Sequence, residues 1–115
     1  MQHGFVEAAG HNLEYRLIPA HQVNRPTLVF LHEGLGSLAM WRDFPAKVAA
    51  ATGCRTLVYS RYGYGESDLL TESFGVRYMH DEALVALPEL LDKLGIDKPV
   101  LVGHSDGGSI ALIHA

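Results

Sequence analysis

The stretch KPVLVGHSDGG, residues 98–108, gives the strongest indication of the fold. It opens with an apolar, β-branched run at 100–102, which is typical of a buried β-strand. The pattern Gly-His-Ser-Asp-Gly follows at 103–107, and residues 108–115 then have helical character. A Gly-x-Ser-x-Gly pattern between a strand and a helix is the setting of a nucleophile elbow, the sharp turn that presents a serine.

The spacing of the two glycines in this pattern has a steric reason. Gly103 and Gly107 lack a Cβ, so a strand and a helix can pass closely on either side of Ser105. The turn predicts a strained backbone at Ser105, with its hydroxyl at the carboxyl edge of the sheet beside the first amides of a helix. Such patterns also occur in turns without chemistry, and the flanking strand and helix favour the catalytic interpretation.

The rest of the chain alternates strands and helices, which predicts a mainly parallel sheet with crossover helices. The expected fold class is α/β, with an opening antiparallel hairpin. The hairpin strands are expected at 4–8 and 12–18, with a turn at 10–12. A strand at 27–31, a helix at 38–51 with Pro45 in its first turn, and a strand at 54–60 are expected next. A helix from 76, kinked by Pro88 and ended by Gly95, then leads to the stretch described above. The apolar stripe of the helix from 76 is Ala83, Leu84, Leu87, Leu90, Leu91 and Leu94.

Composition restricts the classes of protein. The 115 residues are 48% hydrophobic with a net charge of −4 and no basic face, which favours one soluble domain and disfavours nucleic acid and membrane partners. The single Cys54 allows no internal disulfide, and we expect it to be buried. The amino terminus has no signal pattern, so the expected location is cytoplasmic. No metal-ligand spacing occurs, and we expect no metal and no cofactor.

Three stretches, in order, resemble the α/β-hydrolase family. Residues 31–37 (LHEGLGS) match its His-Gly oxyanion loop, residues 61–68 (RYGYGESD) match a loop usually written Arg-Gly-x-Gly-x-Ser, and residues 103–108 match its elbow. The resemblance covers nearly the whole chain from Thr27. It implies that residues 1–115 are the amino-terminal portion of a single domain with an incomplete α/β-hydrolase fold, truncated after the elbow.

The resemblance also implies roles for individual residues. Ser105 is expected to be the nucleophile, and His32 to brace its loop rather than transfer protons. Two backbone amides, those of Asp106 and Gly34 (less favoured, Leu35), are expected to form the oxyanion hole. The expected substrate pocket contains Leu35, His104 and Trp41, although a core role for Trp41 remains the more favoured reading.

Two departures from the family pattern matter. Glu33 stands where the family commonly has glycine, and a carboxylate there opposes catalysis unless it is paired or faces away. The family places its acid and its histidine after the nucleophile, but Asp106 and His114 are the only such residues here and neither suits the role. His114 lies nine positions along a helix from Ser105, about 13 Å away at about 1.5 Å per residue.

The leading hypothesis is a serine hydrolase that cleaves an ester or related acyl bond of a small molecule through an acyl-enzyme on Ser105. A second hypothesis is a catalytically incompetent fragment or interaction module, which self-associates through an exposed sheet edge. A nucleotide-binding domain is a weak third reading, because Gly63-x-Gly65 continues to Asp68 where a dinucleotide fingerprint has its third glycine.

Overall fold

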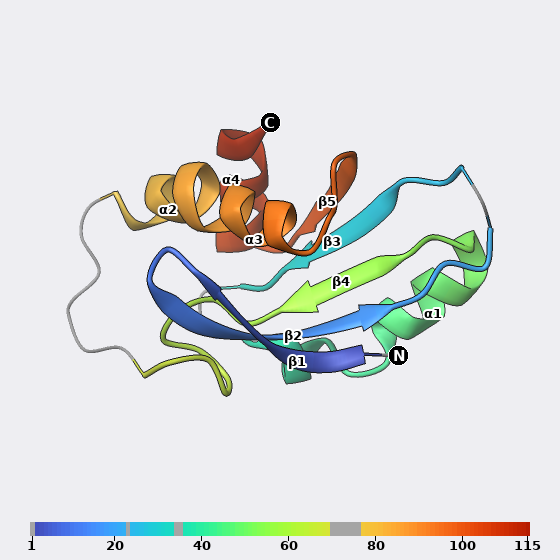
Figure 1. The fold of residues 1–115 in the computed structure, drawn as a ribbon, viewed down its shortest axis with the longest axis horizontal. Helices are drawn as coiled ribbons and strands as arrows, with labels where there is room; N and C mark the ends of the chain where they lie inside the picture. The colour runs from blue at the N-terminus through green and yellow to red at the C-terminus, as the bar shows by residue number, and fades with distance from the viewer. Residues whose placement is uncertain (1, 23, 34–35, 70–76) are drawn as a thin grey trace.

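The computed structural model describes residues 2–22, 24–33, 36–69 and 77–115. Its centre is a mixed five-stranded sheet with the strand order β1-β2-β4-β3-β5 (Figure 1). β1 and β2 pair antiparallel, β2 and β4 pair antiparallel, and β3 runs parallel to both β4 and β5. The strands are β1 (Gln2–Ala8), β2 (His11–Ile18), β3 (Thr27–Leu31), β4 (Thr56–Tyr59) and β5 (Pro99–Gly103). The predicted α/β class, with its antiparallel start, is confirmed.

Helical segments cover both faces of the sheet. The 3₁₀-helix η1 (Leu38–Trp41) and α1 (Phe44–Thr52) lie on one face. On the other face (Figure 1) lie α2 (Tyr78–Asp81), the π-helical η2 (Glu82–Ala86), α3 (Leu87–Lys93) and α4 (Asp106–His114). As predicted, Pro45 stands in the first turn of its helix.

Two apolar clusters separate these layers. The larger joins β1 to β4 with η2, α3 and α4, and the smaller joins β3 and β4 with η1 and α1. Every residue of β3 is buried, because β3 lies inside the sheet with helices on both sides. This pattern explains its continuous apolar sequence. Cys54 is buried in the smaller cluster, as expected.

Three details differ from the sequence prediction. The hairpin turns at Ala9 and Gly10, both with positive φ, rather than at 10–12. Before Pro88 the helix widens into the π-helical turn η2, which accommodates a residue that has no N–H to donate. Because that turn shifts the helical register, Leu84 is 54% exposed and Ala86 is buried in its place.

Candidate active site

The turn between β5 and α4 holds Ser105 at φ 55° and ψ −116°. This positive φ is strained for a residue with a Cβ and agrees with the elbow predicted from the sequence. α4 begins at Asp106, two residues before the predicted helix start. Ser105 is an exposed residue directly after the carboxyl end of β5.

Two glycines make this turn possible. A Cβ at Gly107 would overlap the carbonyl group of Leu31, and one at Gly103 would overlap the carbonyl group of Gly107. Both obstacles are backbone, which cannot rotate away. A Cβ at Gly108, by contrast, would lie 3.6 Å from the Gly103 oxygen, an ordinary contact. The elbow therefore requires glycine at 103 and 107 and does not require it at 108.

Asp106 presents its amide and its carboxylate to different partners. As the first residue of α4, it has an N–H with no acceptor inside the helix, as a donor to an oxyanion needs. Its Oδ2 accepts a hydrogen bond from the Tyr78 hydroxyl at 2.8 Å, and this bond raises the pKa of Tyr78. The carboxylate is thereby engaged by α2.

The loop after β3 is tied down at Glu33. Gly34 and Leu35, predicted to give an oxyanion donor and part of the pocket, lie outside the described residues. On either side of them, the Glu33 carbonyl oxygen accepts the Gly36 N–H at 3.0 Å. The same oxygen accepts from His32 Nδ1 at 2.7 Å and from Arg61 Nη2 at 3.1 Å. Three donors on one carbonyl fix where this loop begins and ends.

His32 is a neutral anchor of that loop. Its Nδ1 donates to Glu33, and its Nε2 accepts the Arg61 N–H at 3.0 Å, so both ring nitrogens are engaged. Burial, together with the nearby Arg61 cation, lowers the pKa of His32 to about 4. The ring is therefore uncharged at neutral pH, and its bonds serve the loop rather than proton transfer.

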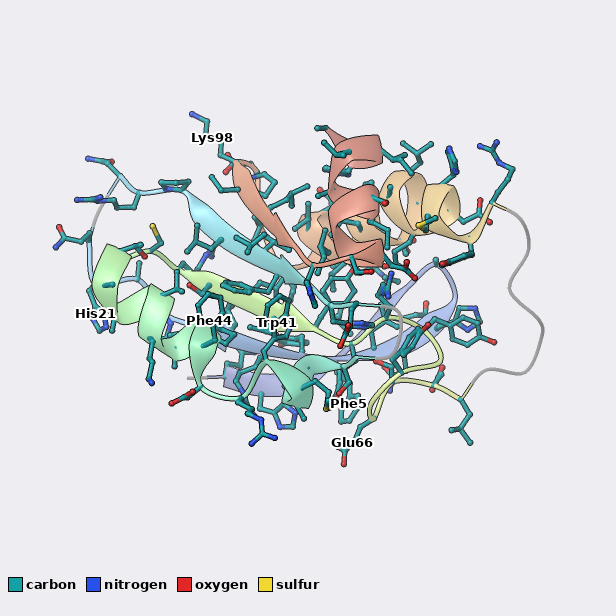
Figure 2. The ribbon with its side chains drawn as sticks, turned by 180° about the vertical axis from the view of Figure 1, so that it is seen from behind. Phe5, His21, Trp41, Phe44, Glu66 and Lys98 are labelled. Atoms are coloured by element: carbon teal, nitrogen blue, oxygen red, sulfur yellow. The ribbon has the colours of Figure 1, made fainter. Side chains whose placement is uncertain are left out.

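A small pocket of about 50 Å³ opens beside the elbow. His104 and Trp41, two of the predicted pocket residues, both line it, and their rings meet edge to face at 6.5 Å. Trp41 also packs edge to face on Phe30 at 5.1 Å and lies beside Phe44 (Figure 2). Trp41 is thus both a core and a pocket residue. Among the residues that the structure describes, the lining is His32, Glu33, Gly36, Ser37, Met40, Trp41 and His104.

Glu33 and His104, two of the lining residues, lie close to each other. Glu33 Oε2 lies 3.8 Å from His104 Nδ1, with both side chains partly exposed. The residues that line the pocket therefore include a carboxylate, imidazoles, an indole and a thioether. The contact with His104 gives the unusual Glu33 a partner.

The described residues do not place a general base on Ser105. His114 Nδ1 bonds the Ala83 carbonyl oxygen at 2.9 Å. Glu82 accepts from the Tyr59 hydroxyl at 2.6 Å, and burial raises the pKa of both Glu82 and Tyr59. Within the described ranges, no histidine or carboxylate is hydrogen-bonded to the Ser105 hydroxyl.

Sequence reasoning missed several residues around the site. Met40 lines the pocket, Arg61 is a buried cation beside His32, and Glu14 and Ser60 form a buried polar network. Arg61 and Ser60 follow directly after a buried strand, a position that could have marked them. Glu14 gave no such signal, because a carboxylate in a hairpin strand is ordinarily exposed.

Known proteins resemble this chain in sequence and in fold. A sequence model of the alpha/beta hydrolase fold matches residues 26–115. Proline iminopeptidase from Saccharolobus solfataricus is 34% identical over 118 residues, covering 100% of this chain and 36% of the relative.

Solved structures extend the comparison. Epoxide hydrolase VrEH1 from Vigna radiata superposes with a TM-score of 0.79 at 23% identity, over 98% of this chain and 33% of that one. Est816, described as an N-acyl homoserine lactone degrading enzyme, superposes with a TM-score of 0.77 at 25% identity, over 96% and 39%. The chain spans between a third and two fifths of the length of these three proteins.

Proposed function

The chain belongs to the α/β-hydrolase fold family, and from this premise we propose that it carries the nucleophile and oxyanion parts of a serine hydrolase. The observation that carries the proposal is Ser105, exposed at positive φ between β5 and the first amide of α4. The proposed reaction is cleavage of a carboxylic ester or a related acyl bond in a small molecule.

The proposed chemistry has two steps at Ser105. Its oxygen attacks the acyl carbon as a base takes the hydroxyl proton, and the alcohol leaves with a proton, so that an acyl-enzyme remains. Water then attacks the acyl carbon as the base takes one of its protons. The bond to Ser105 breaks, the base returns that proton to the Ser105 oxygen, and a carboxylic acid leaves. In both steps negative charge develops on the former carbonyl oxygen.

Two amides are proposed to bind that charge. The Asp106 N–H at the start of α4 is one, and an N–H of the 32–37 loop, at Gly34 by family resemblance, is the other. Each such donor stabilises the transition state by about 3 kcal/mol. The Tyr78 hydroxyl supports this role because it engages the Asp106 carboxylate through a hydrogen bond.

The base and its acid are proposed to come from protein outside these 115 residues. The chain covers at most 39% of the length of the three proteins compared above, so most of the length of each lies outside the matched part. The nucleophile argues for acyl chemistry rather than epoxide opening, since hydrolases of this family that open epoxides use aspartate at the elbow position. Of the three proteins compared above, one is named for a peptidase and one for lactone degradation, both acyl reactions, and the third is an epoxide hydrolase.

A fluorophosphonate probe tests the assignment in the protein expressed from its complete reading frame. We expect the probe to label the wild type and a Ser109→Ala control, whose lost hydroxyl is exposed on the same helix. We expect no labelling of Ser105→Ala. Equal labelling of both variants would remove Ser105 from the role of nucleophile.

A second candidate function is a non-catalytic interaction module. It is favoured by β5, which pairs with β3 on one side and, in the part of the sheet that the structure describes, with no strand on the other. Val100 on this edge is 45% exposed. An open apolar edge invites pairing with a second copy. We expect the 115-residue chain to dimerise with concentration in light scattering and Val100→Lys to be monomeric; if the chain is monomeric throughout, this candidate fails.

A further inference from the structure

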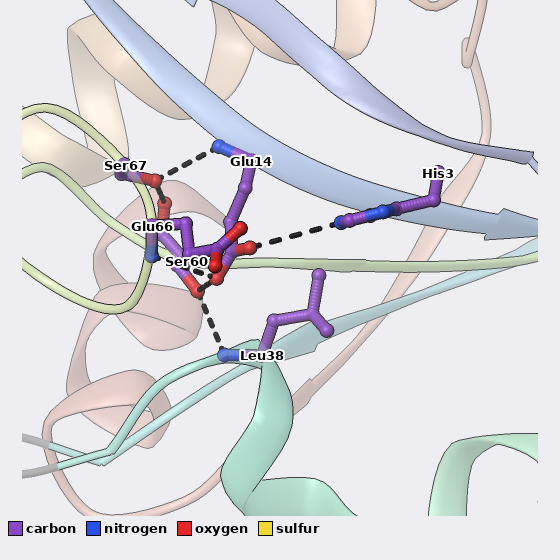
Figure 3. A network of polar contacts seen from close by, with 6 residues as sticks. All are labelled: His3, Glu14, Leu38, Ser60, Glu66 and Ser67. Carbon is purple, nitrogen blue, oxygen red and sulfur yellow. Dashed lines mark hydrogen bonds and ion pairs between the residues drawn. The ribbon is translucent and has the colours of Figure 1, made fainter.

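A buried polar network links β2, the end of β4 and the start of η1 (Figure 3). Its centre is Glu14, whose side chain is 7% exposed. Glu14 Oε1 accepts the Ser60 hydroxyl at 2.6 Å and the Glu66 N–H at 3.1 Å, and Oε2 lies 3.7 Å from His3 Nε2. A buried carboxylate is costly unless bonded in this way.

The second member, Ser60, has one proton and gives it to Glu14. Its lone pairs are then directed elsewhere, and the Ser60 oxygen accepts the Leu38 N–H at 2.8 Å. Leu38 is the first residue of η1, where a helix leaves N–H groups without internal acceptors. Ser37 stands at the N-cap position but makes no side-chain cap bond. Ser60 therefore caps η1 from 22 positions away in the sequence.

The 61–68 loop packs closely over the network at Gly65. A Cβ at Gly65 would overlap Glu14 Oε1 and lie 2.5 Å from Ser60 Oγ. The 61–68 loop can close over the two polar side chains because this position has no side chain. The loop completes the enclosure, with its Ser67 hydroxyl donating to the Ser60 carbonyl at 2.6 Å and accepting the Glu14 N–H at 2.9 Å.

The capped helix carries the pocket wall, since Met40 and Trp41 of η1 both line the pocket beside the elbow. We propose that Ser60, oriented by Glu14, is a positioning residue that fixes this wall and so sets the binding of the acyl group. This inference rests on the proposed hydrolase function. Neither residue touches the pocket, and their effect on substrate passes through Leu38.

Paired serine variants test the proposal. Ser60→Ala removes the cap of η1, whereas Ser67→Ala removes another buried hydroxyl that makes two hydrogen bonds, neither of them to η1. The measurement is hydrogen–deuterium exchange at the Leu38 amide, with the amides of β3 as the internal reference. We expect this exchange to be about tenfold faster in Ser60→Ala than in Ser67→Ala, because a tenfold change corresponds to the loss of one buried hydrogen bond. Equal Leu38 exchange in both variants would overturn the proposal.

Kinetics in the protein from the complete reading frame give the second readout. For an ester with a long acyl chain, Ser60→Ala should raise KM about fivefold with kcat unchanged, and Ser67→Ala should change neither. If Ser60→Ala lowered kcat without raising KM, or if the two variants had equal KM, Ser60 would not position the pocket wall. If no variant, wild type included, hydrolyses esters, the proposed function fails while the Leu38 exchange result still stands.

Glu14 variants keep the proposal testable if Ser60→Ala does not fold. Glu14→Gln retains an oxygen that accepts the Ser60 hydroxyl, and Glu14→Ala does not. We expect Leu38 exchange within about twofold of wild type for Glu14→Gln and about tenfold faster for Glu14→Ala. Wild-type exchange in Glu14→Ala would show that Glu14 does not orient Ser60.

Discussion

The two sides of the site are built in different ways. The elbow side, residues 103–107, is shaped by backbone contact, with two glycines where a Cβ would meet carbonyl groups. The loop side, made of His32, Glu33 and residues 36–38, is held by hydrogen bonds: Arg61 donates to His32 through its backbone N–H and to the Glu33 carbonyl through its side chain. The Ser60 hydroxyl oxygen accepts the Leu38 N–H. A substitution that violates a steric requirement disrupts the fold at once, whereas a set of hydrogen bonds can lose one bond and keep the others. The elbow side should therefore tolerate substitutions less well than the loop side.

The sharpest test of this difference uses neighbouring glycines of the elbow. We expect Gly107→Ala to lower the free energy of unfolding by about 4 kcal/mol or to prevent folding, because the Leu31 carbonyl has no room to yield. Gly108→Ala should be neutral or stabilising by up to about 1 kcal/mol, since alanine favours a helix. Urea unfolding measures both. Similar losses in the two variants would show that the elbow is not set by this contact.

We expect acid to lower the free energy of unfolding through His32, on the loop side. The pKa of His32 is about 4 in the fold against 6.5 for the free group, so between these values the unfolded chain binds the proton that the fold excludes. The free energy of unfolding therefore falls as pH drops from 6.5 to 4, by about 3 kcal/mol from this residue.

The matched variant for this pH effect is His32→Gln, which has no titratable ring. Its unfolding free energy, measured by urea titration at each pH, should fall less steeply between pH 6.5 and 4 than that of the wild type. Parallel curves for the two proteins would mean that His32 is not the neutral anchor of the loop.

The smallest difference between two variants is expected at Gly65, in the 61–68 loop that closes over the Glu14 network. Gly65→Ala and Gly10→Ala both place alanine at positive φ, but a Cβ at Gly10 meets nothing within 4 Å. We expect Gly10→Ala to cost about 1 kcal/mol from backbone strain alone. Gly65→Ala should cost about 2 kcal/mol more, because Glu14 and Ser60 must shift. Equal costs in thermal unfolding would argue against the tight closure.

The sequence predicted the elbow side better than the loop side, for a physical reason. Buried strands and the spacing of Gly103 and Gly107 are local features, so β3, β5 and the turn at Ser105 could be read directly. The Glu14 network depends on residues 14, 38, 60 and 67 meeting only after the sheet forms. No local pattern shows that a carboxylate in a hairpin strand will be covered.

The sequence predicted the helices only in part. The kink expected at Pro88 takes the form of a π-helical turn before it, and that shift exposes Leu84. The start of α4 at Asp106 follows from the positive φ of Ser105, which the motif predicts but helical periodicity does not. The oxyanion donor expected at Gly34 stays a prediction, since that residue lies outside the described part of the chain.

Mapping an acyl adduct shows whether the elbow makes Ser105 the nucleophile. The protein from the complete reading frame is mixed with an activated ester, quenched in acid within the first turnover and digested for mass spectrometry. We predict the acyl mass on the peptide that contains Ser105, and its loss in Ser105→Ala but not in Ser109→Ala. Ester turnover with the acyl group on another residue, or turnover that survives in Ser105→Ala, would contradict the account.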